Sequence, residues 1–425
     1  MNAFTTIDSC RLCGNPELAP LLSLGDQYLT GRFPRTRHEP VTRGPLELVR
    51  CAGHPMACGL VQLKHSYDAT EMYGDNYGYR SSLNQTMVSH LQERVEYLSR
   101  LASLSDGDVV LDIGSNDGTT LSFYPETVDR IGIDPTAAKF RELYARGIQV
   151  VPDFFSAELF SSASGGRKAR IVSSIAMVYD LPRPLDFARE VASVLKDDGI
   201  WYLEQSYMPL MLETTGYDTI CHEHVEYYAL SQIDWMTRRA GLRILDVQLN
   251  RVNGGSFGVT VCKTDSRYRS NERAVMTILA NERRQALDSS APFEEFAQRV
   301  DAHRGALVGL LDRLNGEGSL VLGYGASTKG NVILQFCDIR SDRIPLIAEV
   351  NEEKFGSFTP GTCIPIVSER EAHALKPDYF LAMPWHFRDN LLRREERFLA
   401  SGGRMIFPLP AIEIAGSGKA GDDPR

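Results

Sequence analysis

The chain has 425 residues, of which 43% are hydrophobic and 24% charged, a balance typical of globular proteins. This length exceeds one compact core and predicts two or three domains. The formal net charge of −9, without a run of Lys and Arg, argues against nucleic-acid binding. No apolar run approaches the roughly 20 residues that span a bilayer, and residues 1–6 lack a basic and then apolar signal segment. We therefore expect a cytoplasmic protein with no nucleic-acid or membrane partner.

Half of the eight cysteines fall within the first 58 residues, where Cys10 and Cys13 form a C-x-x-C pair. In a reducing compartment, cysteines paired in this way hold zinc more often than they form disulfides. Cys51 and Cys58 lie further along with His54 between them, so the fourth ligand is Cys51 or His54. Free buried thiols are the alternative interpretation. Four protein ligands leave no open position, which predicts a structural site.

A tyrosine-rich segment follows, in which Tyr73, Tyr77 and Tyr79 are interspersed with glycines. This spacing fits neither a strand nor a helix. It suits a lid or wall of a substrate site with phenols as hydrogen-bonding groups, or a loop that packs against the cysteine module. Residues 84–104 then carry apolar side chains at helical spacing and predict a helix that leads into a middle domain.

The middle domain opens with an apolar strand at residues 108–114, which ends in Asp112 and Gly114. A second strand at residues 130–134 ends in Asp134, at the separation where an acid binds ribose hydroxyls. The turn between strand and helix reads D-x-G-x-x-x-G, and an acid before the glycine suits an ammonium and a sulfonium better than a pyrophosphate. The pattern therefore favours S-adenosylmethionine (SAM) over a nicotinamide. The residues expected to bind the cofactor are Asp112, Gly114, Asn116, Asp117, Gly118 and Asp134.

Further strands at residues 170–174 and 199–204 are separated by helix-length segments. Such alternation predicts a parallel sheet flanked by helices. A similar α/β domain without a cofactor is the alternative.

A dense group of acid and base side chains occupies residues 220–228, with two histidines, two carboxylates and two phenols. A cofactor turn followed by such a cluster points to an enzyme that moves protons beside a bound cofactor.

The last third of the chain repeats the theme of strand, glycine turn and helix. Residues 264–317 predict helices, and residues 319–330 contain Gly323, Gly325 and Lys329. Backbone N–H groups at the start of the helix can meet a diphosphate, and Lys329 adds a charge or is a solvated surface residue. Trp385 follows another strand, at residues 379–383, and is expected to line the same crevice. The tail at residues 416–425 is expected to be disordered.

With these motifs in this order, the chain resembles the sugar C-methyltransferases, which methylate a ring carbon of a nucleotide-linked keto-deoxysugar in antibiotic and surface-glycan pathways. The resemblance runs from Cys10 to about Pro410. The motifs that carry it lie at residues 58–63, 77–81, 114–118, 222–224, 254–256, 323–330, 360–362 and 364–366.

The resemblance implies an α/β protein with a zinc-binding module at 1–75 and a class I (Rossmann-like) SAM methyltransferase domain at 76–265. A Rossmann-like domain at 266–415 would help to hold the sugar nucleotide. The expected substrate is a nucleotide-diphosphate sugar, dTDP-linked, and the enzyme would act as a monomer or a homodimer.

Carbon methylation needs a base that removes a proton alpha to a carbonyl and donors that stabilise the enolate oxygen. His224 is the candidate base, because an imidazole titrates near neutrality; a structural histidine is the alternative. Glu223 orients this imidazole or contacts the sugar. His222 and Tyr79 or Tyr77 are candidate donors to the oxyanion. Neither proton transfer nor methyl transfer needs a catalytic metal.

Two positions depart from the pattern that the resemblance leads us to expect. Cys221 stands where a tyrosine is expected before H-E-H, and His386 stands where an asparagine is expected after Trp385. A thiol is a weak donor, so another group stabilises the enolate or the substrate differs. The first rival is an O- or N-methyltransferase of the same fold acting on a sugar nucleotide or other nucleotide-linked substrate. The second rival is a non-catalytic scaffold.

Overall fold

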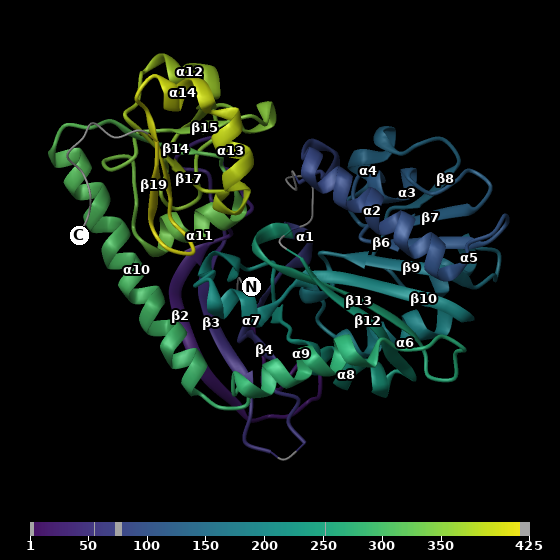
Figure 1. Ribbon diagram of the computed structural model, residues 1–425. Helices are drawn as coiled ribbons and strands as arrows, with labels where there is room; N and C mark the ends of the chain where they lie inside the picture. The colour runs from purple at the N-terminus through teal and green to yellow at the C-terminus, as the bar shows by residue number, and fades with distance from the viewer. Residues whose placement is uncertain (1–3, 55, 73–78, 251, 417–425) are drawn as a thin grey trace.

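The computed structural model describes residues 4–54, 56–72, 79–250 and 252–416, and it contains three main sheets. None of the helices in these ranges is both long and apolar enough to cross a membrane. The sheets occur in chain order, but each of the three units that they define contacts the others (Figure 1).

The N-terminal unit is built on long antiparallel strands, β2 (Leu18–Tyr28) and β3 (Arg43–Cys51). The four-stranded sheet is completed by β4 (Val61–Leu63) and by β11 (Glu226–Tyr227). A separate pair joins β1 (Phe4–Thr6) to β5 (His65–Tyr67), followed by α1 (Ala69–Met72). Because β11 comes from the acid/base segment at 220–228, that segment is anchored to the N-terminal unit by strand pairing.

The middle unit is a seven-stranded sheet in the order β12-β13-β10-β9-β6-β7-β8, with β13 antiparallel to its neighbours. The central strand β6 is buried along its whole length, as expected for a parallel strand covered on both faces. The strands are β6 (Val109–Ile113), β7 (Asp129–Ile133), β8 (Ile148–Val151), β9 (Ala169–Ile175), β10 (Leu195–Ser206), β12 (Leu242–Asn250) and β13 (Ser256–Lys263).

Strand order reverses between β6 and β9, which pair in parallel and both end at one edge of the sheet. Ligands of open α/β sheets bind at such a switch point. The accompanying helices are η1 (Ser81–Leu83), α2 (Gln85–Ala102), α3 (Thr119–Ser122), α4 (Ala137–Phe140), η2 (Arg141–Leu143), α5 (Ala157–Ala163), η3 (Val178–Asp180), α6 (Pro184–Val194), α7 (Met208–Glu213), η4 (Tyr217–Thr219), α8 (Leu230–Arg239) and η5 (Val252–Gly254).

Helix α2 shows how the local sequence forms one of these elements. Asn84 caps the helix, since its side chain accepts hydrogen bonds from the N–H groups of Thr86 and Met87. Its buried face consists of Met87, Leu91, Val95, Leu98 and Ala102, which recur at helical spacing. The helix predicted at residues 84–104 is therefore present.

Two helices, α9 (Glu272–Arg284) and α10 (Ala291–Gly316), connect to the C-terminal unit. Its six-stranded sheet has the order β16-β15-β14-β17-β18-β19, with β19 antiparallel. The strands are β14 (Val321–Tyr324), β15 (Ile347–Glu349), β16 (Ile366–Ser368), β17 (Tyr379–Ala382), β18 (Arg404–Phe407) and β19 (Glu413–Ala415). The helices are α11 (Thr328–Phe336), η6 (Glu352–Lys354), α12 (Glu369–Ala374), η7 (Trp385–Phe387), α13 (Arg388–Arg394) and α14 (Glu396–Ala400).

The order of strands reverses again, this time between β14 and β17. Figure 1 shows β2 and β3 between the middle unit and the C-terminal unit, with α10 running alongside. The end of β2 docks on α11, because the Tyr28 N–H donates to the Gln335 side chain and the Gln335 amide donates back to the Tyr28 carbonyl. Because α11 also contacts η4 of the middle unit, all three units meet at this helix.

Candidate active site and metal centre

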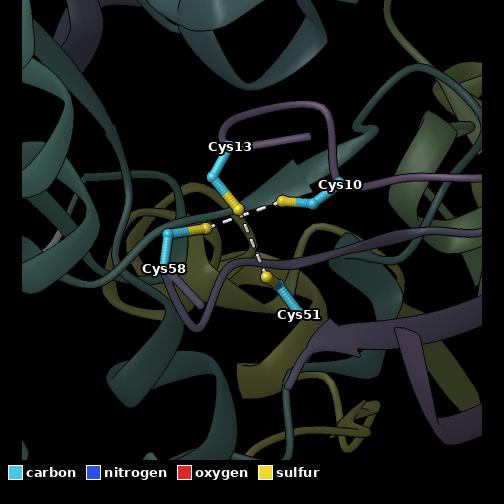
Figure 2. A group of neighbouring side chains, drawn as sticks. All are labelled: Cys10, Cys13, Cys51 and Cys58. Carbon is cyan, nitrogen blue, oxygen red and sulfur yellow. Dashed lines mark hydrogen bonds between the residues drawn. The ribbon is translucent and has the colours of Figure 1, made fainter. Parts of the chain in front are cut away.

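The four N-terminal cysteines converge in the structure (Figure 2). Their sulfurs all lie within 4.8 Å of one another, with Cys10 and Cys58 3.5 Å apart and Cys13 and Cys51 3.4 Å apart. A tetrahedron of Zn–S bonds of about 2.3 Å has edges of about 3.8 Å, so the cluster fits one zinc ion. The Asn15 amide also lies 3.3 Å from the Cys51 sulfur, a contact that orients this ligand.

The structure distinguishes between Cys51 and His54 as the fourth ligand. Cys51 belongs to the cluster, whereas His54 is exposed and its Nδ1 accepts the N–H of Met56. The set is Cys10, Cys13, Cys51 and Cys58, and it leaves no position for a substrate.

The cofactor turn follows β6 and has the backbone conformation of a glycine-rich loop. Gly114, Asn116 and Gly118 all have positive φ, at 74°, 52° and 77°. Asparagine tolerates this left-handed region better than most residues, which explains how Asn116 fits there. Asp117 accepts hydrogen bonds from Thr119 and from the Ser82 N–H.

Asp134 lies at the end of β7 beside this turn, and its carboxylate accepts hydrogen bonds mainly from the backbone. It accepts the Asn116 N–H at 2.8 Å, and the N–H and hydroxyl of Thr136, each at 2.6 Å. A carboxylate has about four acceptor sites, so capacity for one more donor remains. The contact of Asp134 with ribose stays a prediction.

Asp112 is buried on β6, and the Ser173 hydroxyl donates to it at 2.5 Å. Burial and the charge of Asp134 raise the pKa of Asp112 to about 7, against the hydroxyls of Ser173 and Thr120, which lower it. Among the described residues, the groups that act on this buried acid are thus hydroxyls and a second acid, with no cation. The ammonium and sulfonium of SAM would supply that positive charge, so the residues fit this cofactor.

The tyrosine-rich segment packs against the cofactor turn where it is described. The Ser81 N–H donates to the Asn116 side chain, and the Asn116 amide donates to the Tyr79 carbonyl. The phenol of Tyr79 is about half exposed, at 48%. Tyr77 lies outside the described residues. Residues 79–82 therefore border the predicted cofactor turn, and a role of the tyrosines as a wall of the substrate site stays a prediction.

His224 is oriented by the backbone. Its Nδ1 lies 3.0 Å from the carbonyl oxygen of Thr219, which can only accept, so Nδ1 carries the proton and Nε2 keeps a lone pair. Burial and the charge of Lys329 lower the pKa of His224 to about 4, so the imidazole is neutral at neutral pH. This tautomer leaves Nε2 able to accept a proton.

A short series of contacts links His224 to the cofactor turn. Tyr179, in η3 after β9, has its ring 4.3 Å from the His224 ring. Two residues earlier, the side chain of Met177 lies 3.0 Å from where a β-carbon on Gly114 would stand. A small pocket beside His224 is lined by Tyr179, Ser206, Met208, Met211, Thr219, Glu226 and Tyr227. The imidazole therefore lies near the switch point of the methyltransferase-like sheet.

Glu223 faces the other two units. The Thr30 hydroxyl donates to its carboxylate at 3.3 Å, and a β-carbon on Gly31 would stand 2.5 Å from its Oε1. A β-carbon on Gly31 would also lie 3.8 Å from the Thr328 hydroxyl at the start of α11. Burial raises the pKa of Glu223. The acceptor for Nδ1 of His224 is thus the Thr219 carbonyl, and a contact of Glu223 with substrate stays a prediction.

His222 and Cys221 lie deeper than their neighbours. His222 is fully buried, packs edge-on against Tyr67 with ring centroids 4.5 Å apart, and interacts with the backbone of Gln27 and Gly44, which raises its pKa. Burial lowers its pKa to about 4. Burial raises the pKa of Cys221, which keeps this thiol neutral. A role of His222 as an oxyanion donor stays a prediction.

The second glycine turn follows β14, at the switch point of the C-terminal sheet. Gly323 and Gly325 are required by close packing, because added β-carbons would stand 2.7 Å from Ile347 and 2.7 Å from Pro384. Lys329 lies in the first turn of α11, where burial lowers its pKa while the charge of Asp218 raises it. The Trp385 Nε1–H donates to Asp218 at 2.7 Å, so this donor already has a partner.

Sequence reasoning missed Thr219, Tyr179 and Asp218. The carbonyl of Thr219 acts through the backbone, which no side-chain pattern reveals. Asp218, four residues before His222, could have been found from the sequence. An acid in an otherwise apolar and aromatic stretch indicates a buried carboxylate that needs a hydrogen-bond partner. Its partner, Trp385, lies 167 residues away.

The fold and the site define an α/β enzyme with a structural zinc centre and a cofactor turn suited to SAM. Three family models match consecutive parts of the chain. They are described as "Putative zinc binding domain" (residues 10–73), "Methyltransferase domain" (85–247) and "C-methyltransferase C-terminal domain" (251–410).

Among curated relatives, C-methyltransferase NovU of Streptomyces niveus is 30% identical over 412 residues, which cover 96% of this chain and 97% of that protein. The chain belongs to this family of zinc-containing, SAM-dependent C-methyltransferases.

Solved structures show weaker similarity. The plantazolicin methyltransferase BpumL, in complex with SAH, gives a TM-score of 0.35 at 11% identity, with 42% of this chain and 86% of that chain covered. The mitomycin 7-O-methyltransferase MmcR gives 0.31 at 15% identity, with 40% and 54% covered. Similarity at this level is too low to add to the assignment, which rests on the sequence comparisons.

Proposed function

We propose that this C-methyltransferase acts on a nucleotide-linked keto-deoxysugar and methylates the carbon alpha to its ketone. The observation that carries the proposal is the hydrogen bond from His224 Nδ1 to the Thr219 carbonyl, which leaves Nε2 as a proton acceptor near the cofactor turn. A ring carbon becomes nucleophilic only after loss of its alpha proton. A methyltransferase that attacks oxygen or nitrogen needs no such base on carbon.

In this proposal, Nε2 of His224 takes the alpha proton, and the enolate carbon would bond to a methyl carbon whose bond to sulfur breaks. SAM, when bound, would supply that methyl group, with SAH as the leaving group. The tyrosines at 77 and 79 are the proposed donors to the enolate oxygen, because Cys221 is a neutral thiol and a poor substitute for a phenol. Glu223, between Thr30 and the start of α11, is the proposed contact with the sugar.

The nucleotide part is assigned to the C-terminal unit. Its switch point presents the N-terminus of α11, a nine-residue helix whose Ser327 side chain accepts the Gly330 N–H. Helix N-termini stabilise anions, and Lys329 adds a positive charge to this turn. Trp385 is the proposed wall of the same site. We assign a diphosphate to this end and infer that the dTDP-linked class is the first to test.

The direct test is methyl transfer from isotopically labelled SAM to a panel of dTDP-linked 4-keto-6-deoxyhexoses, with product NMR to locate the new carbon. The matched control is each sugar nucleotide with its ketone reduced to an alcohol. We expect label on a ring carbon next to the ketone and none on the alcohols. Label on oxygen or nitrogen, or equal methylation of the alcohols, would refute carbon methylation by enolisation.

A further inference from the structure

The short helix η4 bridges the C-terminal unit and the proposed base with three consecutive residues. The first, Tyr217, places its hydroxyl 3.1 Å from Nδ1 of His303 on α10 and 3.5 Å from the sulfur of Cys337 at the end of α11. His303 Nε2 lies 2.6 Å from the Pro408 carbonyl, so Nε2 donates there and Nδ1 accepts from Tyr217. This end of η4 is thereby fixed to the C-terminal unit.

The second residue, Asp218, is fully buried and accepts a hydrogen bond from the indole N–H of Trp385 at 2.7 Å. The backbone N–H groups of Asp218 and Thr219 also act on this carboxylate and lower its pKa. Lys329 supplies the nearby positive charge that favours the ionised form of Asp218, against the burial that raises its pKa. A buried carboxylate is costly to desolvate, so its retention here needs a reason beyond packing.

The third residue, Thr219, turns its carbonyl to His224 Nδ1 at 3.0 Å, and the Tyr227 hydroxyl lies 3.5 Å from the same oxygen. Asp218 and Thr219 are neighbours in η4, and the Thr219 N–H acts on the Asp218 carboxylate that Trp385 holds. The chain of contacts therefore runs from η7, at the carboxyl end of β17, through Asp218 to the imidazole.

We propose that Asp218 is a positioning residue, which uses its hydrogen bond with Trp385 to hold the Thr219 carbonyl on His224 and so couples the C-terminal unit to the base. A substrate that orders the loop at 384–387 would then also order the imidazole. The consequence for catalysis rests on the proposed function of His224, whereas the coupling itself concerns only its tautomer and orientation.

The test uses the full-length, zinc-loaded enzyme with its nine histidines labelled with nitrogen-15. The imidazole signals of His224 are assigned by their loss in His224→Gln. In the unaltered enzyme we expect a single tautomer with the proton on Nδ1. In Asp218→Ala and in Trp385→Phe, which keeps the ring but lacks the donor, we expect the two nitrogen signals to move toward each other as the tautomers mix.

Two further variants separate positioning from general disruption. Asp218→Asn keeps an acceptor for the indole and should restore the single tautomer. Trp235→Phe, which removes the indole stacked 3.7 Å from the Arg239 guanidinium on α8, is the matched control and should leave His224 unchanged. With substrate, kcat should fall about 10- to 100-fold in Asp218→Ala and Trp385→Phe, and the KM for SAM should stay within about twofold.

Identical His224 signals in the unaltered enzyme and in folded Trp385→Phe would overturn the coupling. If His224→Gln still transfers methyl groups at the normal rate while Asp218→Ala changes the tautomer, the coupling is supported and the proposed base is refuted. The two failures therefore give different results.

Discussion

The two glycine turns of this enzyme are held in the same way. In the middle unit, Asp134 at the end of the neighbouring strand accepts the Asn116 N–H at 2.8 Å. In the C-terminal unit, Glu349 at the end of β15 accepts the Ala326 N–H, also at 2.8 Å. In both sheets the turn follows the strand at which the order reverses, so topology and an acidic backbone acceptor place both turns equivalently.

The turns differ in charge and in the helix that follows. The first has the buried acid Asp112 behind it and leads into α3, a helix of four residues. The second has Lys329 in the first turn of α11, a helix of nine residues. In our proposal, related folds give one turn suited to a cation and one suited to an anion. The fold would then fix where a ligand lies, and a few charged side chains would decide which ligand binds.

The largest effect is expected at the imidazole between these two turns. His224→Ala should lower kcat for methyl transfer by at least about 100-fold, because it removes the proposed general base. Its affinity for SAM, measured by calorimetry, should stay near that of the unaltered enzyme. His54→Ala, at an exposed histidine outside the zinc cluster, is the control. Loss of SAM affinity in His224→Ala would show that His224 supports the cofactor site instead.

The zinc module offers the next test, because β11 ties the acid/base segment to the N-terminal sheet. Cys51→Ser should lose zinc, measured by elemental analysis, and should lower both thermal stability and turnover, since structural zinc contributes directly to folding. His54→Ala should retain the full zinc content. Zinc retention in Cys51→Ser would contradict the four-cysteine set.

The charge of the second turn is tested by Lys329→Gln. Loss of a cation facing a diphosphate should raise the KM for the sugar nucleotide about tenfold or more, with the affinity for SAM unchanged. Lys263, which forms an ion pair with Asp197 at 2.8 Å at the end of β13, provides the matched control as Lys263→Gln. Equal effects of both substitutions on the KM would remove Lys329 from the substrate site.

The charge of the first turn is tested by Asp112→Asn, which should weaken SAM about tenfold and leave the KM for the sugar nucleotide unchanged. The pKa of this carboxyl is raised from 3.8 to about 7, so between these values the folded protein holds a proton that the unfolded chain has released. Stability from this group is fully present below about pH 4 and is lost as pH rises to 7.

The cofactor-free Asp112→Asn variant should therefore be more stable than the unaltered protein at pH 8, by at most about 4 kcal/mol, and its unfolding should depend less on pH. Chemical unfolding at pH 5 and pH 8 measures both effects. A loss of stability at pH 8 would show that the Asp112 carboxylate stabilises the fold. It would then give no support to a difference in ligand charge between the two turns.

Features that depend on residues close together in the sequence could be predicted from it. The alternation of strands and helices indicated the two α/β units, the C-x-x-C pair indicated the zinc module, and the spacing of Asp112, Gly114 and Asp134 indicated the cofactor turn. The long strands β2 and β3 were not predicted, because their burial alternates irregularly.

The contacts that make the site were beyond such patterns. Glu223 meets Thr30, which lies 193 residues earlier, and Asp218 meets Trp385, which lies 167 residues later. Pairings across units depend on how three sheets pack together, and no residue spacing encodes them. The same holds for the Thr219 carbonyl, since every residue has one and only the fold aims it at His224.

The central claim is that His224 removes a proton from carbon. The most direct measurement follows deuterium entering a dTDP-linked 4-keto-6-deoxyhexose in heavy water by NMR, with the demethylated cofactor SAH bound so that methylation cannot follow. The account predicts exchange at the carbon alpha to the ketone with the unaltered enzyme, and its loss in His224→Ala. Exchange at the same rate in both proteins would contradict it.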